Sequence, residues 1–141
     1  MELKNRKASF EYFFLEEFTA GLVLAGMEVK SLREGGGSIA EAFCTVTKGE
    51  AFILNMHIPP YKDKGFMELD PKRPRKLLLE RKEIDRLERS LKDAGLTIVP
   101  VKVFDLNGIL KLKIALAKGK KQADKRQSLK EKDLDRDMQR S

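Results

Sequence analysis

The sequence predicts a mainly β protein, a small closed or nearly closed antiparallel β-barrel of about six strands with two or three flanking helices. Three observations favour this class. Strand-like runs come in pairs with short turns between them, one clear helix stands before the last pair, and the 141 residues contain no internal repeat. A hydrophobic fraction of 41% supports one modest core. We therefore expect one barrel domain, residues 1–117, and a basic tail, residues 118–141.

The first expected elements are a strand and a short helix. Phe10, Tyr12 and Phe14 recur at every second position after a polar lead at residues 5–8, which predicts a strand that continues into residues 19–24. Gly26 ends this strand. Residues 27–34 predict a helix that ends at a glycine.

Two hairpins are expected. Residues 43–47 and 51–56 form the first, with Lys48-Gly49-Glu50 as its turn. Residues 97–104 and 109–117 form the second around Asn107-Gly108, a dipeptide that strongly favours a two-residue hairpin turn. In its last strand, alternation predicts that lysines face outward, at Lys111 and Lys113, and that the inward side chains are Leu110, Leu112, Ile114 and Leu116.

The segment between the hairpins combines a loop with a helix. Residues 57–75 hold four prolines and many charges, which predicts a long loop. The apolar run 77–79 is too short to assign by periodicity. Residues 82–94 form the clearest helix, because Ile84, Leu87, Leu91 and Ala94 fall on one stripe.

The charge balance favours a polyanionic partner. Lys and Arg number 29 against 22 Asp and Glu, which gives a net charge of +7 and a pI near 9.5. A membrane surface is the weaker alternative, because no apolar run is long enough to span a bilayer and no apolar segment follows the first charged residues. Cys44 is the single cysteine, so no internal disulfide is possible and a cytoplasmic location is expected.

Enzymatic sites are not predicted. The segment GLVLAGMEVKS has Met27-Glu28 where a phosphate-binding loop has Lys-Ser/Thr, so a strand-to-helix turn is expected. His57 is the only histidine and lacks a Cys-x-x-Cys neighbour, which argues against zinc. A nucleophilic site at His57 would need a Ser or Cys beside it in the fold. We expect no catalytic residue, no metal and no cofactor.

Three basic clusters favour RNA or DNA over an ordinary solvated surface. Lys30 and Arg33 form the first, which residues 5–7 would extend if they lie nearby. The Pro-rich loop holds the second, Lys72, Arg73, Arg75 and Lys76. The tail holds the third, Lys118, Lys120, Lys121, Lys125, Arg126, Lys130, Lys132, Arg136 and Arg140.

Residues 118–141 hold nine Lys/Arg and five Asp/Glu, a net of +4, and we expect this tail to be disordered alone and helical against a partner.

The sequence contains five distinctive motifs: AGLVLAGMEVKSLREG, NMHIPPY, DPKRPRKLLL, GLTIVPVKVF and KIALAKGKKQADKR. Together they resemble the SmpB family of SsrA-binding proteins, in family order and over nearly the whole chain. The resemblance implies an OB-like closed barrel and a non-enzymatic role in trans-translation, the rescue of stalled ribosomes. It implies binding to the tRNA-like domain of transfer-messenger RNA, and a tail that enters the decoding centre and the empty mRNA channel as a helix.

The same resemblance implies partners and site residues. The ribosome is the second partner, elongation factor Tu and alanyl-tRNA synthetase act on the same RNA, and the protein is a monomer in the complex. The RNA-facing residues of the barrel would be Asn5, Lys7, Glu28, Lys30, Ser31, Arg33, Arg75, Lys76 and Leu78. Those at the root of the tail would be Lys118, Gly119, Lys120 and Lys121. Those acting on the ribosome would be Asp124, Lys125, Arg126, Lys130, Lys132, Arg136 and Arg140.

Two positions depart from the family pattern. Thr19 stands where the family usually has the Glu of Phe-Glu-Ala-Gly, and Glu80 replaces the usual His or Asn after KLLL. Two other function classes remain as alternatives. One is a small ribosomal or assembly protein with a basic extension, which would be present in every ribosome. The other is a small nuclease, which would turn over labelled RNA.

Overall fold

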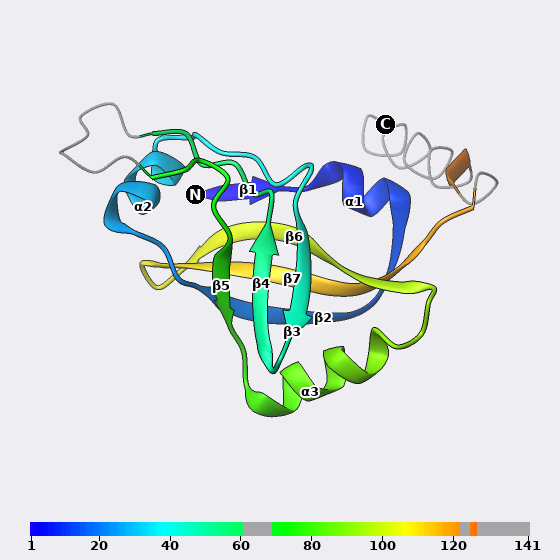
Figure 1. The fold of residues 1–141 in the computed structure, drawn as a ribbon. Helices are drawn as coiled ribbons and strands as arrows, with labels where there is room; N and C mark the ends of the chain where they lie inside the picture. Colours follow the sequence, from blue (N-terminus) through cyan, green and yellow to red (C-terminus); the bar gives the residue numbers. More distant parts are fainter. Residues whose placement is uncertain (61–68, 122–124, 127–141) are drawn as a thin grey trace.

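The computed structural model describes residues 1–60, 69–121 and 125–126. Within these residues the chain forms seven strands and three helices (Figure 1). In chain order they are β1 (Glu2–Lys4), α1 (Arg6–Glu11), β2 (Tyr12–Leu22), α2 (Gly26–Arg33), β3 (Phe43–Thr47), β4 (Glu50–Leu54), β5 (Arg75–Leu78), α3 (Arg81–Ser90), β6 (Leu96–Leu106) and β7 (Ile109–Gly119). The prediction of a mainly β protein is confirmed.

The strands form one antiparallel sheet. Their order is β1-β6-β3-β4-β5-β2-β7, and β6 also pairs with β7, so the pairing runs in a ring through six strands while β1 lies outside it. The β2–β7 and β6–β7 pairings extend along most of these long strands. The strand pairing is short where β3 meets β6, at Cys44 and Ile98, and where β2 meets β5. Figure 1 shows β3, β4 and β5 running across the direction of β2, β6 and β7.

The main core gathers buried side chains from all six strands of this ring and from α2 and α3. Leu110, Leu112, Ile114 and Leu116 of β7 are all buried, which confirms the predicted inward face. Ile39, Ile53, Leu32 of α2 and Leu87 of α3 join them in the same cluster. A second, smaller cluster was not predicted. Ala115 and Ala117, on the other face of β7, are buried with Val99 and with Ala8 of α1. The second half of β7 is therefore covered on both faces.

Both hairpins are confirmed. The first turn has positive φ at Lys48 and Gly49, and the second has it at Asn107 and Gly108. Two consecutive left-handed residues are the geometry of a two-residue turn whose twist matches that of the strands, which explains the Asn-Gly signal.

The N-terminus differs from the prediction. Residues 5–8 are not a polar lead, because β1 pairs with β6 and α1 follows it at once. Phe10 lies in α1, so the expected strand begins only at Tyr12. The physical reason is Asn5, whose side chain accepts a hydrogen bond from the Ala8 N–H at 3.2 Å and caps the helix. A six-residue helix is too short to show a helical periodicity in the sequence. The alternation of Phe10, Tyr12 and Phe14 predicts a strand there instead.

The structure also assigns the short apolar run and changes the ends of several predicted elements. Leu77 and Leu78 of the apolar run 77–79 belong to β5, which pairs with β4 on one side and β2 on the other. α3 ends at Ser90, four residues earlier than expected, and Leu91 caps it. β7 reaches Gly119, which pairs with Tyr12. Residues 61–68 of the predicted loop and residues 122–124 and 127–141 of the tail lie outside the described residues, so the conformation of the tail stays a prediction. The division into two domains at residue 117 also stays a prediction.

Candidate nucleic-acid interface

The structure divides the predicted barrel site into buried and exposed residues. Four side chains are buried: Asn5, Glu28, Ser31 and Arg75. Five are exposed: Lys7, Lys30, Arg33, Lys76 and Leu78. Exposed side chains can contact a partner directly. Buried ones can act only through the backbone and side chains that they hold.

A buried ion pair ties α2 to β5 and to the segment before it. Arg75 is 1% exposed, and its Nε and Nη2 donate to Glu28 Oε2 at 2.9 and 2.6 Å. It also donates to the carbonyl oxygens of Met56 and Pro71. Arg73 binds the same carboxylate, with Nε 3.2 Å from Oε2. The guanidinium therefore joins three separate parts of the backbone at one point.

Glu28 remains ionised in this setting. Burial acts to raise the pKa of Glu28, but hydrogen bonds from Arg73, from the Ala25 N–H and from Arg75 outweigh it, so the pKa lies below its ordinary value. The Ala25 bond, 2.9 Å long, also caps the start of α2. One carboxylate thus fixes both the beginning of a helix and the chain that packs beside it.

Ser31 makes the next connection along α2. Its Oγ donates to the carbonyl oxygen of Pro59 at 2.6 Å, and the Gly36 N–H donates to the Ser31 carbonyl. Gly37 has φ +108° and a Cβ there would stand 2.7 Å from Leu32 Cδ2. The turn after α2 therefore needs glycine to pass close to the core.

Arg33 connects the end of α2 to the β6–β7 turn. Its Nη2 donates to Asp105 Oδ1 at 2.9 Å and to the Gly108 carbonyl at 2.7 Å. The N-terminal amine lies 3.3 Å from Asp105 Oδ2. Residues 1–3 line a hollow with Arg33, whereas Asn5 and Lys7 line another one. The two parts of the first predicted cluster thus lie on different hollows.

The outward row of β5 carries Lys76 and Leu78, which alternate with the buried Arg75 and Leu77. Lys76 Nζ is 3.5 Å from Glu50 Oε1, and Leu78 is 55% exposed opposite Gly21. Packing in the core does not explain a leucine at position 78, because this side chain is exposed. Its side chain presents an apolar surface beside a cation.

The two departures from the family pattern lie at the surface. Thr19 is exposed on β2 opposite Lys113, whose Nζ is 3.6 Å from Glu17 Oε2. Glu17 therefore supplies a carboxylate two residues from Thr19. Glu80 stands at the start of α3, where its N–H donates to Glu83 Oε1 at 3.0 Å.

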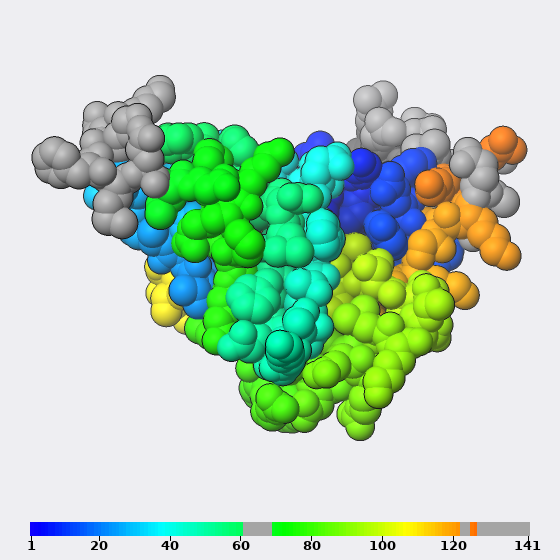
Figure 2. All heavy atoms as spheres, viewed as in Figure 1, coloured from blue at the N-terminus to red at the C-terminus, as the bar shows by residue number. Residues whose placement is uncertain are grey.

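The root of the tail is held against α1. The Lys120 N–H donates to the Glu11 carbonyl at 2.8 Å and its Nζ to the Ser9 carbonyl at 3.4 Å. The same Nζ lies 4.9 Å from the centre of the Phe13 ring, in range of a cation–π contact. Figure 2 shows the orange residues that follow β7 beside the dark blue α1. The chain therefore leaves the sheet in a direction set by α1.

The remaining predicted residues fall into two groups. Lys118, Gly119, Lys121 and Arg126 are exposed, and the Lys125 N–H donates to the Lys121 carbonyl at 3.1 Å. Those outside the described residues are Asp124, Lys130, Lys132, Arg136 and Arg140.

The acidic partners of the basic residues were not predicted. Asp105 stands 72 residues from Arg33, and Glu41 stands 34 residues from Lys7. No local signal in the sequence connects residues so far apart.

Other chemistry is limited within the described part of the chain. It contains no group of three or more His, Cys, Asp or Glu side chains placed to hold a metal ion. His57 pairs through its backbone with Ser38, at 2.9 and 3.0 Å. Cys44 is buried, and burial raises the pKa of its thiol. None of the described helices combines the length and apolarity that crossing a membrane requires.

Comparison with known proteins identifies the family. The model of the SmpB protein family matches residues 2–141. The chain is 48% identical over 141 residues to the SsrA-binding protein of Bacteroides thetaiotaomicron, which covers 99% of this chain and 94% of that protein. It is 51% identical over 130 residues to the SsrA-binding protein of Fervidobacterium nodosum, which covers 92% and 87%.

A solved structure agrees with these relatives. The structure described as "tmRNA-SmpB: a journey to the center of the bacterial ribosome" aligns with a TM-score of 0.71 and 41% identity, over 86% of this chain and 85% of that one. The motifs, the sheet of seven strands and the near full-length similarity agree, and the chain belongs to the SmpB protein family.

Proposed function

We propose that this protein binds the tRNA-like domain of transfer-messenger RNA and acts as a non-enzymatic rescue factor of stalled ribosomes. The observation that carries the proposal is the similarity to SsrA-binding proteins over 99% of the chain. The solved structure described with the words tmRNA, SmpB and ribosome supports the same partners. The net charge of +7 fits a polyanionic ligand.

We propose that the barrel grips the RNA with exposed cations on a rigid frame. Lys30 and Arg33 project from α2, and Lys76 from β5. The buried pair of Glu28 and Arg75 joins these two elements, so it would hold the cations at a fixed spacing. The ring of strand pairings supports the OB-like closed barrel that the family resemblance implies.

The tail is proposed to have a separate role. Residues 118–141 would enter the decoding centre and the empty mRNA channel, with Asp124, Lys125 and Arg126 near its start. Elongation factor Tu and alanyl-tRNA synthetase would act on the same RNA, and the protein would work as a monomer in the cytoplasm. The anchoring of Lys120 on α1 supports a tail that leaves the barrel in a defined direction.

Equilibrium binding tests the proposal. The full chain is titrated with the isolated tRNA-like domain and with random RNA of equal length, at several salt concentrations. The domain should bind much more tightly, and log affinity should fall with log salt by about 0.7 to 0.9 per neutralised phosphate. Equal affinity for the two RNAs would contradict the proposed function.

A further inference from the structure

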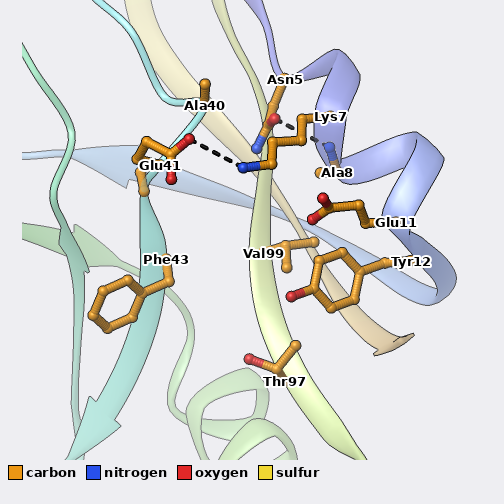
Figure 3. A pocket seen from close by; sticks show the side chains of 11 residues that line it. Asn5, Lys7, Ala8, Glu11, Tyr12, Ala40, Glu41, Phe43, Thr97 and Val99 are labelled. Carbon is orange, nitrogen blue, oxygen red and sulfur yellow. Dashed lines mark hydrogen bonds and ion pairs between the residues drawn. The ribbon is translucent and has the colours of Figure 1, made fainter. Parts of the chain in front are cut away.

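A pocket lies between α1, β6 and the chain that leads into β3 (Figure 3). Its volume is about 210 Å³. Pockets for drug-sized ligands enclose roughly 300–1,000 Å³. The pocket therefore suits one flat ring system, which is smaller than a whole nucleotide.

Aromatic and apolar groups form the body of the pocket. Tyr12 and Phe43 lie on opposite sides, with Val99 between them (Figure 3). Phe43 is 45% exposed, so its ring surface is accessible to a ligand. RNA-binding proteins stack unpaired bases on such aromatic rings. The walls thus favour a planar, partly apolar ligand.

The rim carries one cation and two carboxylates. Lys7 Nζ lies 3.1 Å from Glu41 Oε1, and this hydrogen bond, together with the charges of Glu41 and Glu11, raises the pKa of Lys7. The three groups sum to a charge of −1, which disfavours a phosphate inside the pocket. A carboxylate accepts two parallel N–H bonds, and guanine is the base that offers two adjacent N–H groups, with an acceptor oxygen beside them for Lys7.

A cationic hollow adjoins this pocket. Asn5 lines both. The charged residues of the hollow are Lys4, Arg6, Lys102, Lys113 and Glu17. Four cations and one carboxylate leave a net charge of +3, which suits the phosphates of a strand whose base enters the neighbouring pocket.

We propose that the pocket between Tyr12 and Phe43 binds one unpaired guanine base, and that the adjoining hollow binds the phosphates of the same strand. The proposal rests on the RNA-binding function proposed above. It adds the type of base, the residues that recognise it, and Glu41 as the specificity-determining side chain.

A nuclear magnetic resonance titration tests the pocket. The ¹⁵N-labelled full chain is titrated separately with GMP, AMP, CMP and UMP, and with ribose 5-phosphate. GMP should shift the amides of Phe43, Thr97 and Val99 at about tenfold lower concentration than the other nucleotides, as expected for one bidentate base contact. Ribose 5-phosphate should shift only residues of the hollow.

Matched variants separate recognition from folding. Glu41→Gln should reduce the preference for GMP to less than about twofold, because a neutral amide accepts with one oxygen only. Glu88→Gln, at an exposed position of α3, should leave the preference unchanged. Phe43→Ala should weaken GMP binding several-fold, whereas Ile109→Ala, at a position 59% exposed on β7, should not. The amide spectrum of each variant reports whether it is folded.

The outcomes distinguish this proposal from the wider function. Equal responses to all four nucleotides, pocket amides that do not shift with GMP, or an unchanged preference in folded Glu41→Gln would overturn the guanine pocket, even if the tRNA-like domain binds tightly. A clear GMP preference together with equal affinity for the tRNA-like domain and random RNA would support the pocket and contradict the proposed function.

Discussion

At the scale of single residues, the buried ion pair of Glu28 and Arg75 is the least expected feature. The family motifs imply that both residues face the RNA, but both are buried and bind each other. An isolated buried charge is costly, so each residue needs the other. They would act on RNA as positioning residues that hold α2 against β5.

Arg75→Met should destabilise the fold by about 3–5 kcal/mol, because it leaves the Glu28 carboxylate buried with fewer partners. Urea unfolding measures the change. Arg81→Met is the control, because the Arg81 ion pair with Asp85 is exposed and contributes less than about 1 kcal/mol. Equal stability of the two variants would show that the buried pair does not hold the frame.

The stability should also depend on pH through Glu28. The pKa of Glu28 is lowered in the folded state, so its contribution is present above the unfolded pKa of about 4.3 and is lost as pH falls through the folded pKa. The difference in unfolding free energy between the wild type and Glu28→Gln should therefore shrink between about pH 6 and pH 3. A difference that stays constant over this range would exclude the carboxylate as the cause.

At the scale of elements, α1 is placed by the irregularity in β6. The register of β6 against β7 shifts between Pro100 and Lys102. At this bulge the Pro100 carbonyl accepts from Asn5 Nδ2 at 2.9 Å, and the Val101 carbonyl accepts from the Asn5 N–H at 2.9 Å. One side chain thus caps α1 and fastens it to the sheet.

Asn5→Asp isolates the second of these two roles. The aspartate keeps an oxygen for the Ala8 N–H but puts a buried carboxylate against the Pro100 carbonyl, so a loss of about 1–3 kcal/mol is expected on thermal or urea unfolding. Ser9→Ala, which removes an exposed 2.8 Å bond on the same helix, should cost less than about 0.5 kcal/mol. A neutral effect of Asn5→Asp would mean that α1 does not depend on the bond to Pro100.

At the scale of the whole molecule, charge is distributed unevenly along the chain. Residues 118–141 carry a net +4 of the total +7. Lys120 fixes the point where the tail begins, on the side of α1. The two proposed RNA contacts, one by the barrel and one by the tail, should therefore be separable by substitution.

Replacing Asp124, Lys125 and Arg126 with Ala should leave the affinity for the isolated tRNA-like domain within about twofold and should abolish tagging of stalled peptides. Filter binding and a translation assay on a message without a stop codon measure the two effects. Loss of RNA affinity in this variant would contradict the division of labour between barrel and tail.

Charge reversal of Lys30 and Arg33 to Glu should have the opposite pattern, because these exposed cations lie on α2, among the residues proposed to bind the tRNA-like domain. Removing two phosphate contacts should lower the affinity for the tRNA-like domain and reduce its salt slope by about 2. Reversal of both Arg89 and Lys92, which are exposed at the end of α3 and on the turn after it, controls for the same change in net charge. A variant that binds RNA normally but fails in tagging would place Lys30 and Arg33 in the ribosomal contact instead.

Much of the fold could be predicted because its signals are local. Asn107-Gly108 specifies a turn by its own backbone preferences, and the alternation of Leu112 and Ile114 with lysines specifies a strand with one buried face. α1 and β5 could not be predicted, since a six-residue helix and a four-residue strand contain too few residues to show a period. α1 forms where Asn5 binds the backbone of β6, and β5 forms because it pairs with both β4 and β2.

The sequence by itself determined the family, the hairpins, the inward face of β7 and the basic residues that suit RNA. Only the tertiary structure decided which of those residues reach the surface. Arg75 and Lys76 are neighbours in one basic run, yet one is buried on Glu28 and the other is exposed beside Leu78. The physical reason is that burial and ion pairing depend on partners far away in the chain, which a local pattern of charges does not contain.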